Sequence, residues 1–408
     1  MMRCCRPVLL ALHIGLLATQ VAHSHPSNPV CELSPFSDRA QKLLPTDADS
    51  ACSPQLLSDL ALDLAYANGS CDPANHLMPS LASSDFIKKC NFTGVHTVFF
   101  ITAHAYGHNQ SVLLSRVLDR LDGDGHLLLI HVDDYEHSWF VRDVIDLVQV
   151  PSRCLVRFGA VVYLSATDIE MIMAAFHWLL HVNGAWTHVV TLTGQDYPLL
   201  NSTAMATTIS LSHQTWIQSP SCFNADALPE GSNWNNYNRM VTFMFPCVHD
   251  DGKMRIIQAP RSPWVFSSAN DHSNVTFTKL SKFCKSTPLF NNIWTRQTVD
   301  YLLHDPTPIA AYAFFHRSGA ASVEHFWASL LMSNRAEDLH VQSPCLMSWH
   351  DGVGYDGTKA TIDGTHNTFY TMEQKDLLQD AFKKGTPFAR KFLQSNTDVL
   401  NFIDGLSS

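Results

Sequence analysis

The stretch that decides the fold reads His96-Thr97-Val98-Phe99-Phe100-Ile101-Thr102, a run of β-branched and aromatic residues without a break. Such a run is typical of a strand that is buried on both faces. The apolar spacing predicts further strands over 127–132, 154–158, 161–163 and 187–192, and helices over 110–121, 139–148 and 168–180. Strands that alternate with helices predict an α/β fold with a mainly parallel central sheet and helices on both faces.

The composition of the 408-residue chain is that of an ordinary globular protein, with 46% hydrophobic and 16% charged residues. The net charge of −10 argues against non-specific binding of nucleic acid, which needs a broad positive field. An anionic ligand must therefore be met by a few placed cations, because the surface as a whole repels it.

The N-terminus has the features of a secretory signal. Arg3 and Arg6 precede an apolar stretch from Val8 to Ala22, and in Ala22-His23-Ser24 small residues stand at the positions that a signal peptidase reads. That stretch is shorter than the roughly 20 residues that span a bilayer. We expect residues 1–24 to be a cleaved signal peptide, 25–92 a cysteine-containing stem and 93–408 the main domain. This predicts the secretory lumen, either Golgi or secreted; with an uncleaved segment the chain is a type II Golgi membrane protein.

The cysteine pattern fits that compartment. Nine cysteines lie beyond the predicted signal peptide, at positions 31, 52, 71, 90, 154, 222, 247, 284 and 345. They are scattered and show no CxxC spacing, which favours disulfides over zinc. Because nine is odd, at least one cysteine is expected to be free or to pair with another molecule.

Polar residues follow the predicted strands, where ligands bind in sheets of this class. Thr102-Ala103-His104 is either an elbow that lies against a nucleotide or a turn in which His104 caps the next helix. Asp133, followed by Asp134, has three readings: a divalent-metal ligand, a hydrogen-bond acceptor for a base or ribose, and a helix cap. The residues alone do not decide between them.

Three further groups are candidates for chemistry. Gln195 and Asp196 lie on the rigid corner 193–198, where Asp196 either contacts a ligand or ties loops together through backbone amides. Glu324 falls in the first turn of a helix that begins near Ser322, where it is either favoured by the helix dipole or is a general base. Arg390 and Lys391 are either solvated cations or the groups that neutralise a diphosphate. Residues 387–392 and 399–403 predict a closing helical segment.

These segments, in this order, resemble the core-2/I-branching β-1,6-N-acetylglucosaminyltransferase family, which also includes the peptide O-xylosyltransferases. The resemblance runs from about Val95 to Ile403. The matching segments are Thr102-Ala103-His104, Ile130-His131-Val132-Asp133, Val161-Val162-Tyr163, Leu192 to Pro198, Asp251-Gly252-Lys253, Thr287-Pro288-Leu289-Phe290, Thr295 to Leu303, Glu324-His325-Phe326-Trp327-Ala328 and Phe388-Ala389-Arg390-Lys391-Phe392.

The resemblance implies a GT-A-like fold and a transfer from a UDP-sugar to a hydroxyl of a glycan or glycoprotein, with inversion and without a divalent metal or other cofactor. It makes Glu324 the catalytic base and Lys391 the cation on the diphosphate. It places Thr102, Ala103, His104, Asp133 and Tyr163 around the nucleotide, so that Asp133 becomes a nucleotide contact. The implied donor sugar is GlcNAc, with xylose as the alternative. Cys90 with Cys154 is the disulfide proposed here.

The chain departs from the family pattern at two places. The second cation that contacts the diphosphate is missing, since the corresponding region reads Gly364-Thr365-His366-Asn367; His366, Lys359 or Arg390 are the candidates to replace it. The acceptor-binding stretch from Ser219 to Asn238 matches poorly, so no acceptor is carried over. Two competing hypotheses are a non-catalytic carbohydrate-binding protein and a metal-dependent transferase that uses Asp133 and Asp134.

Overall fold

The computed structural model describes the larger part of the chain. The described residues are 32–43, 53–67, 70–71, 85–86, 90–105, 110–133, 136–159, 161, 166–182, 184–218, 220–224, 242–248, 254–260, 280–285, 291–315, 322–347 and 369–406. Within these residues no helix has both the length and the apolar character that crossing a membrane requires.

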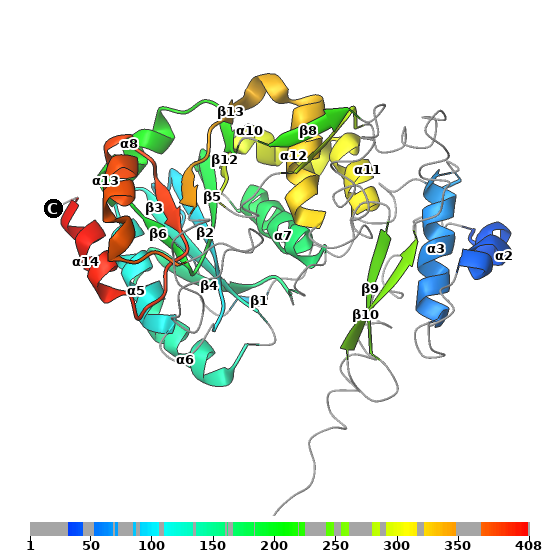
Figure 1. Ribbon diagram of the computed structural model, residues 1–408, viewed down its shortest axis with the longest axis horizontal. Helices are drawn as coiled ribbons and strands as arrows, with labels where there is room; N and C mark the ends of the chain where they lie inside the picture. The colour runs from blue at the N-terminus through cyan, green and yellow to red at the C-terminus, as the bar shows by residue number, and fades with distance from the viewer. Residues whose placement is uncertain are drawn as a thin grey trace, which may run out of the picture.

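An eight-stranded sheet organises the described residues (Figure 1). Its strands, in spatial order, are β1 (Asp85–Phe86), β4 (Arg153–Arg157), β3 (His126–Val132), β2 (Thr97–Ala103), β5 (His188–Thr193), β12 (Ile293–Thr295), β7 (Thr215–Ile217) and β13 (Leu339–Val341). The four consecutive strands β4, β3, β2 and β5 are parallel, whereas β1 and β12 run antiparallel to their neighbours. The carboxyl ends of these four strands therefore lie at one edge.

Helices cover both faces of this sheet (Figure 1). One face is covered by α7 (Thr167–His181), α10 (Arg296–His304), α11 (Pro306–Phe315) and α12 (Ser322–Asn334). The other is covered by α5 (Gln110–Leu121), α6 (Ser138–Leu147), α8 (Ser202–Ser210), α13 (Lys375–Lys383) and α14 (Thr397–Leu406). Strand β2 shows why both faces are needed: Val98 and Phe100 pack into one core, and Phe99 and Ile101 into the other. The expected α/β fold with a mainly parallel sheet and helices on both faces is confirmed.

Smaller elements surround the central sheet. A three-stranded sheet has the order β14 (Cys345–Met347), β15 (Phe388–Arg390) and β6 (Asp196–Pro198). Two separate antiparallel pairs are β8 (Ser221–Asn224) with β11 (Lys282–Lys285), and β9 (Thr242–Val248) with β10 (Met254–Pro260). The remaining elements are α2 (Ser34–Leu43), α3 (Ser53–Ala67) and the 3-10 turns η4 (Ala336–Asp338) and η5 (Met372–Gln374). Helices α2 and α3 lie at the opposite end of the molecule from α14 (Figure 1).

The strands and helices predicted over 96–192 agree with the structure to within one residue at each end, except for the strand over 161–163. Val161 is not in a strand, and residues 162 and 163 lie outside the described residues. The predicted helical segment over 387–392 is wrong, because Phe388–Arg390 is the strand β15 between β6 and β14. Its partners lie far away in the sequence, so the local apolar pattern did not reveal them.

Two disulfides lie within the described residues. Cys90 pairs with Cys154, which confirms the proposed disulfide and joins the segment before β2 to β4. Cys222 pairs with Cys284, which joins β8 to β11. Cys345 is buried and free, in agreement with the odd number of cysteines.

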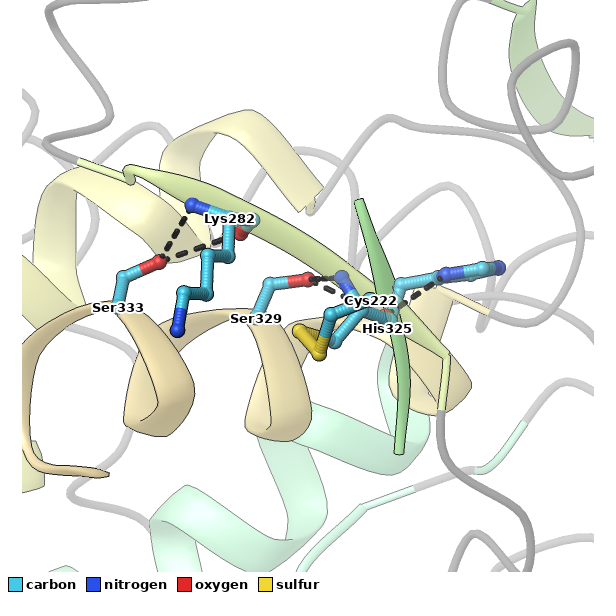
Figure 2. Close-up of a disulfide and its surroundings, with 6 residues drawn as sticks. Cys222, Lys282, His325, Ser329 and Ser333 are labelled. Carbon is cyan, nitrogen blue, oxygen red and sulfur yellow. Dashed lines mark hydrogen bonds between the residues drawn. A yellow bond between two sulfur atoms is a disulfide. The ribbon is translucent and has the colours of Figure 1, made fainter. Parts of the chain in front are cut away.

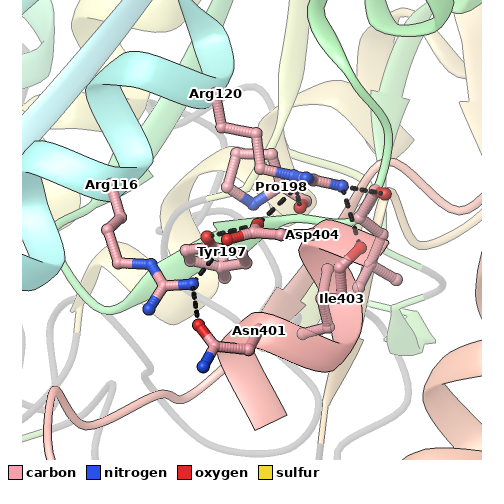
Figure 3. Close-up of polar contacts among 8 residues, drawn as sticks. Arg116, Arg120, Tyr197, Pro198, Asn401, Ile403 and Asp404 are labelled. Atoms are coloured by element: carbon pink, nitrogen blue, oxygen red, sulfur yellow. Dashed lines mark hydrogen bonds and ion pairs between the residues drawn. The ribbon is translucent and has the colours of Figure 1, made fainter. Parts of the chain in front are cut away.

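A polar cluster fastens the C-terminal helix α14 to the rest of the fold (Figure 3). The carboxylate of Asp404 accepts hydrogen bonds from Arg116 (2.5 Å), from Arg120 (3.0 Å) and from the hydroxyl of Tyr197 (2.7 Å). Arg120 also donates to the carbonyls of Pro198 and Leu199, at 2.7 and 2.8 Å. One carboxylate on α14 thereby joins two turns of α5 to β6.

Replacing Asp404 with Asn should lower the free energy of unfolding by about 1–3 kcal/mol, since the hydrogen bonds it loses have charged partners. Denaturant unfolding of the purified chain measures this difference. Asp398→Asn is the matched control, because Asp398 is exposed on the same helix and its loss should change stability by less than about 0.5 kcal/mol. Equal stability of the two variants would contradict the role of the cluster.

Candidate active site

The candidate site lies at the carboxyl edge of the parallel strands, where β2 and β5 end side by side. The amide of Gly194 donates to the carbonyl of Thr102 at 2.8 Å. The hydroxyl of Thr102 donates to the carbonyl of Leu192 at 3.3 Å, and Gln110 reaches across to the carbonyl of Gly194 at 3.2 Å. Thr102 and Ala103, the last two residues of β2, are buried, and Thr102 lies between β3 and β5 in the sheet. Thr102 and Ala103, two of the residues predicted around a nucleotide, therefore lie beside the 193–198 corner.

His104 leaves the end of β2 and is held by an acidic partner that the sequence did not single out. Its Nδ1 donates to Oε1 of Glu136 at 3.3 Å, and the amide of Ala105 donates to the same oxygen at 3.2 Å. Burial raises the pKa of Glu136, but these two hydrogen bonds, the charge of His104 and a hydrogen bond from the backbone of His137 together lower it overall. Glu136 is thus ionised at neutral pH and orients the imidazole. The only sign of this role in the sequence is that Glu136 comes three residues after Asp133.

Asp133 follows β3 and is buried. Its Oδ2 accepts a hydrogen bond of 2.5 Å from the amide of Val161, which joins the end of β3 to the segment after β4. Among the described residues, which do not include Asp134, no group of three His, Cys, Asp or Glu side chains could hold a metal ion. Tyr163, His366 and Lys359 also lie outside the described residues.

Two more buried titratable groups, Asp168 and His131, lie near Asp133. Burial raises the pKa of Asp168, in the first turn of α7, to about 7; the charge of Asp133 adds to this and that of His104 opposes it. Burial also lowers the pKa of His131 to about 3, helped by the charges of His104 and Arg157. His131 is therefore neutral, with its Nδ1 accepting from the amide of Phe158 at 3.2 Å. The sequence did not predict the charge state of either residue, because their environment comes from separate elements.

The corner at 193–198 is closed by an ion pair. Asp196 is 0% exposed; its Oδ2 accepts from the amide of Thr193 at 2.5 Å, and its Oδ1 accepts from Nη1 of Arg390 at 2.9 Å. Arg390 also donates to the hydroxyl of Thr193 at 2.5 Å. The carbonyl of Gln195, which is buried as well, accepts from the amide of Phe392 at 3.0 Å. Asp196 thus ties loops together through a backbone amide, as one of the two sequence readings had it.

Lys391 follows Arg390 at the same edge. Burial and the neighbouring charge of Arg390 lower the pKa of Lys391 to about 8, although the charge of Asp196 opposes this change. The Nζ atom lies 6.0 Å from the centroid of the Phe369 ring. A cation that is held in a desolvated position is suited to an anionic group, because the interaction is stronger there than in water.

Glu324 lies in the first turn of α12, on the face of the sheet that α7 also covers. Its Oε2 is 3.4 Å from Nζ of Lys285, at the end of β11. The chain runs from Lys285 to Asn291 and Asn292, whose backbones exchange hydrogen bonds with Thr191 of β5. The described contacts of the predicted site residues thus form two groups, one around β2, β3 and the corner, and one around Glu324.

Comparisons with known proteins give only distant similarity. No protein-family model matches the chain, and no curated protein sequence does. The bifunctional glycosyltransferase WbbM is 8% identical, with a TM-score of 0.35, over 78% of this chain and 50% of its own. Mouse xyloside xylosyltransferase 1 is 10% identical, with a TM-score of 0.30, over 74% and 98%. Core-mannan synthase A from Aspergillus fumigatus is 11% identical, with a TM-score of 0.27, over 60% and 72%.

The chain spans half the length of WbbM. Similarity at these TM-scores carries no argument about activity. The function of this chain is therefore argued from its residues and their geometry.

The lowered pKa of Lys391 makes a prediction for stability. Its folded pKa of about 8 lies below the ordinary 10.5, so the folded state disfavours the charged form. Lys391 therefore lowers the free energy of unfolding by its full contribution below pH 8, and this contribution disappears as the pH rises from 8 to 10.5. The gain in stability on Lys391→Met should accordingly be larger at pH 7 than at pH 10, as measured by denaturant unfolding.

The exposed Lys375 provides the control. Lys375→Met should shift stability by a similar, small amount at both pH values. A difference between wild type and Lys391→Met that does not change with pH would contradict the buried, desolvated position of this ammonium group.

Proposed function

We propose that the chain is an inverting glycosyltransferase that moves a sugar, GlcNAc in the first place, from a UDP-sugar to a hydroxyl of a glycan or glycoprotein in the secretory pathway. The observation that carries the proposal is the arrangement at the carboxyl edge of β5. There the buried pair of Asp196 and Arg390 holds the backbone next to Lys391, a cation whose pKa is lowered by its desolvation. The family resemblance of the sequence supports the same reading.

In this proposal the nucleotide is bound by the ends of β2 and β3. The backbone at Thr102 and Ala103, the oriented imidazole of His104 and the carboxylate of Asp133 would contact the base and ribose. Lys391 would contact the diphosphate, with Arg390 next to it. Arg390 is already paired with Asp196, so its charge at the diphosphate is partly offset. A GT-A-like site of this kind neutralises the leaving group with protein cations, and no divalent metal takes part.

Inversion requires one in-line displacement at the anomeric carbon. The acceptor oxygen attacks this carbon while its proton passes to the carboxylate of Glu324. The bond from the anomeric carbon to the diphosphate oxygen breaks, and UDP leaves with the electron pair. The negative charge that develops on UDP is stabilised by Lys391, more effectively than by water because the ammonium is already in place.

Replacing Glu324 with Gln should lower the release of UDP from UDP-GlcNAc by about 10²–10⁴, the usual contribution of a general base. The assay uses the full chain from a secretory host, a mixed pool of glycan acceptors and excess EDTA, with UDP-xylose in parallel. Glu337→Gln is the matched control, since Glu337 is exposed in η4 beyond the end of α12.

The outcomes separate the competing hypotheses. Faster release of UDP from UDP-xylose than from UDP-GlcNAc would identify xylose, and not GlcNAc, as the donor sugar. Activity that EDTA abolishes and manganese restores would make Asp133 and Asp134 metal ligands. No release above the level of Glu324→Gln, with either donor, would leave a protein that binds carbohydrate without catalysis.

A further inference from the structure

The edge of β11 is covered by a helix in place of a strand (Figure 2). The hydroxyl of Ser329 on α12 accepts from the amide of Cys284 at 2.8 Å and donates to its carbonyl at 3.2 Å. Ser333, one turn further along, does the same at Lys282, at 2.9 and 3.2 Å. The two serines thus satisfy the backbone groups that a neighbouring strand would otherwise satisfy, and they fix how β11 is placed along α12.

Two further contacts fasten this strand at Cys284. The ring nitrogen Nδ1 of His325 donates to the carbonyl of Cys284 at 3.1 Å. On its other side β11 pairs with β8, and Cys284 is disulfide-bonded to Cys222, its partner in that pairing. Cys284 is therefore held by a helix on one side and by a covalent bond on the other. The residue that follows it, Lys285, has little freedom to move along the helix.

This placement brings Lys285 to the first turn of α12. Its Nζ lies 3.4 Å from Oε2 of Glu324, and the two side chains are 32% and 17% exposed. Oε2 is enclosed by the protein and lies beside this ammonium group, so Lys285 limits how the carboxylate can turn. A carboxylate with one oxygen held by a cation has fewer orientations than one that is held by its backbone alone.

We propose that Lys285 is a positioning residue, which orients the carboxylate of Glu324 toward the acceptor hydroxyl and offsets the charge of this carboxylate beside the anionic donor. The proposal rests on the role of Glu324 as the general base. In this arrangement Lys285 acts through Glu324 and touches neither the donor nor the acceptor. Its loss should therefore slow the proton transfer and leave the binding of both substrates nearly unchanged.

The test compares Lys285→Met and Lys285→Arg with Lys282→Met, a matched control on the same strand. Lys285→Met should lower kcat by about 10- to 100-fold, the usual effect of a misplaced catalytic group. The KM values for donor and acceptor should stay within about twofold, because ground-state binding is not lost. Lys285→Arg should recover most of the rate, and Lys282→Met should behave like the wild type. Unfolding midpoints of all three variants check that the fold is kept.

The results distinguish this proposal from the one on which it rests. If Glu324→Gln is inactive while Lys285→Met keeps the wild-type kcat, the positioning role is refuted and the general base stands. A raised KM with an unchanged kcat would make Lys285 a substrate contact and would refute positioning as well. A wild-type chain that is no more active than Glu324→Gln would overturn the proposed function, and the role of Lys285 with it.

Discussion

The ion pair between Asp196 and Arg390 is the interaction on which the candidate site depends. It joins a segment near the C-terminus to the end of the central strand β5, across nearly two hundred residues of sequence. Because Asp196 has no contact with water, removing either partner would leave a buried charge without compensation, which typically costs about 3–5 kcal/mol. This pair, with the hydrogen bond from Arg390 to Thr193, keeps Lys391 next to the corner at 193–198, whose Gly194 donates to the carbonyl of Thr102 at the end of β2.

The two groups of site residues are held in different ways. The nucleotide side is formed by strand ends that are bound to one another by backbone hydrogen bonds, so its geometry follows from the sheet. The side of Glu324 is formed by helix α12 and strand β11, which meet through serine hydroxyls, while a disulfide joins β11 to β8 on its other side (Figure 2). Both are rigid, which general-base chemistry requires, since a displacement of about 1 Å can cost a hundredfold in rate.

The central strands and their helices could be predicted from the sequence because local patterns determine them. The run Val98 to Ile101 is apolar on both faces, and only a buried strand explains that pattern. The strand β15 could not be predicted, since its partners β6 and β14 are distant in sequence. The candidate site residues could be named from the sequence because their residue types and the order of their motifs are visible there. Glu136 and Asp168 could not, because their charge states depend on neighbours from other elements.

The central claim is that protein cations, and Lys391 above all, neutralise the diphosphate. Calorimetric titration of the full chain with UDP, in excess EDTA and then in manganese, tests it most directly. The account predicts binding in EDTA, an affinity that manganese does not raise, and a loss of at least tenfold on Lys391→Met. Binding that requires manganese, or that Lys391→Met leaves unchanged, would contradict it.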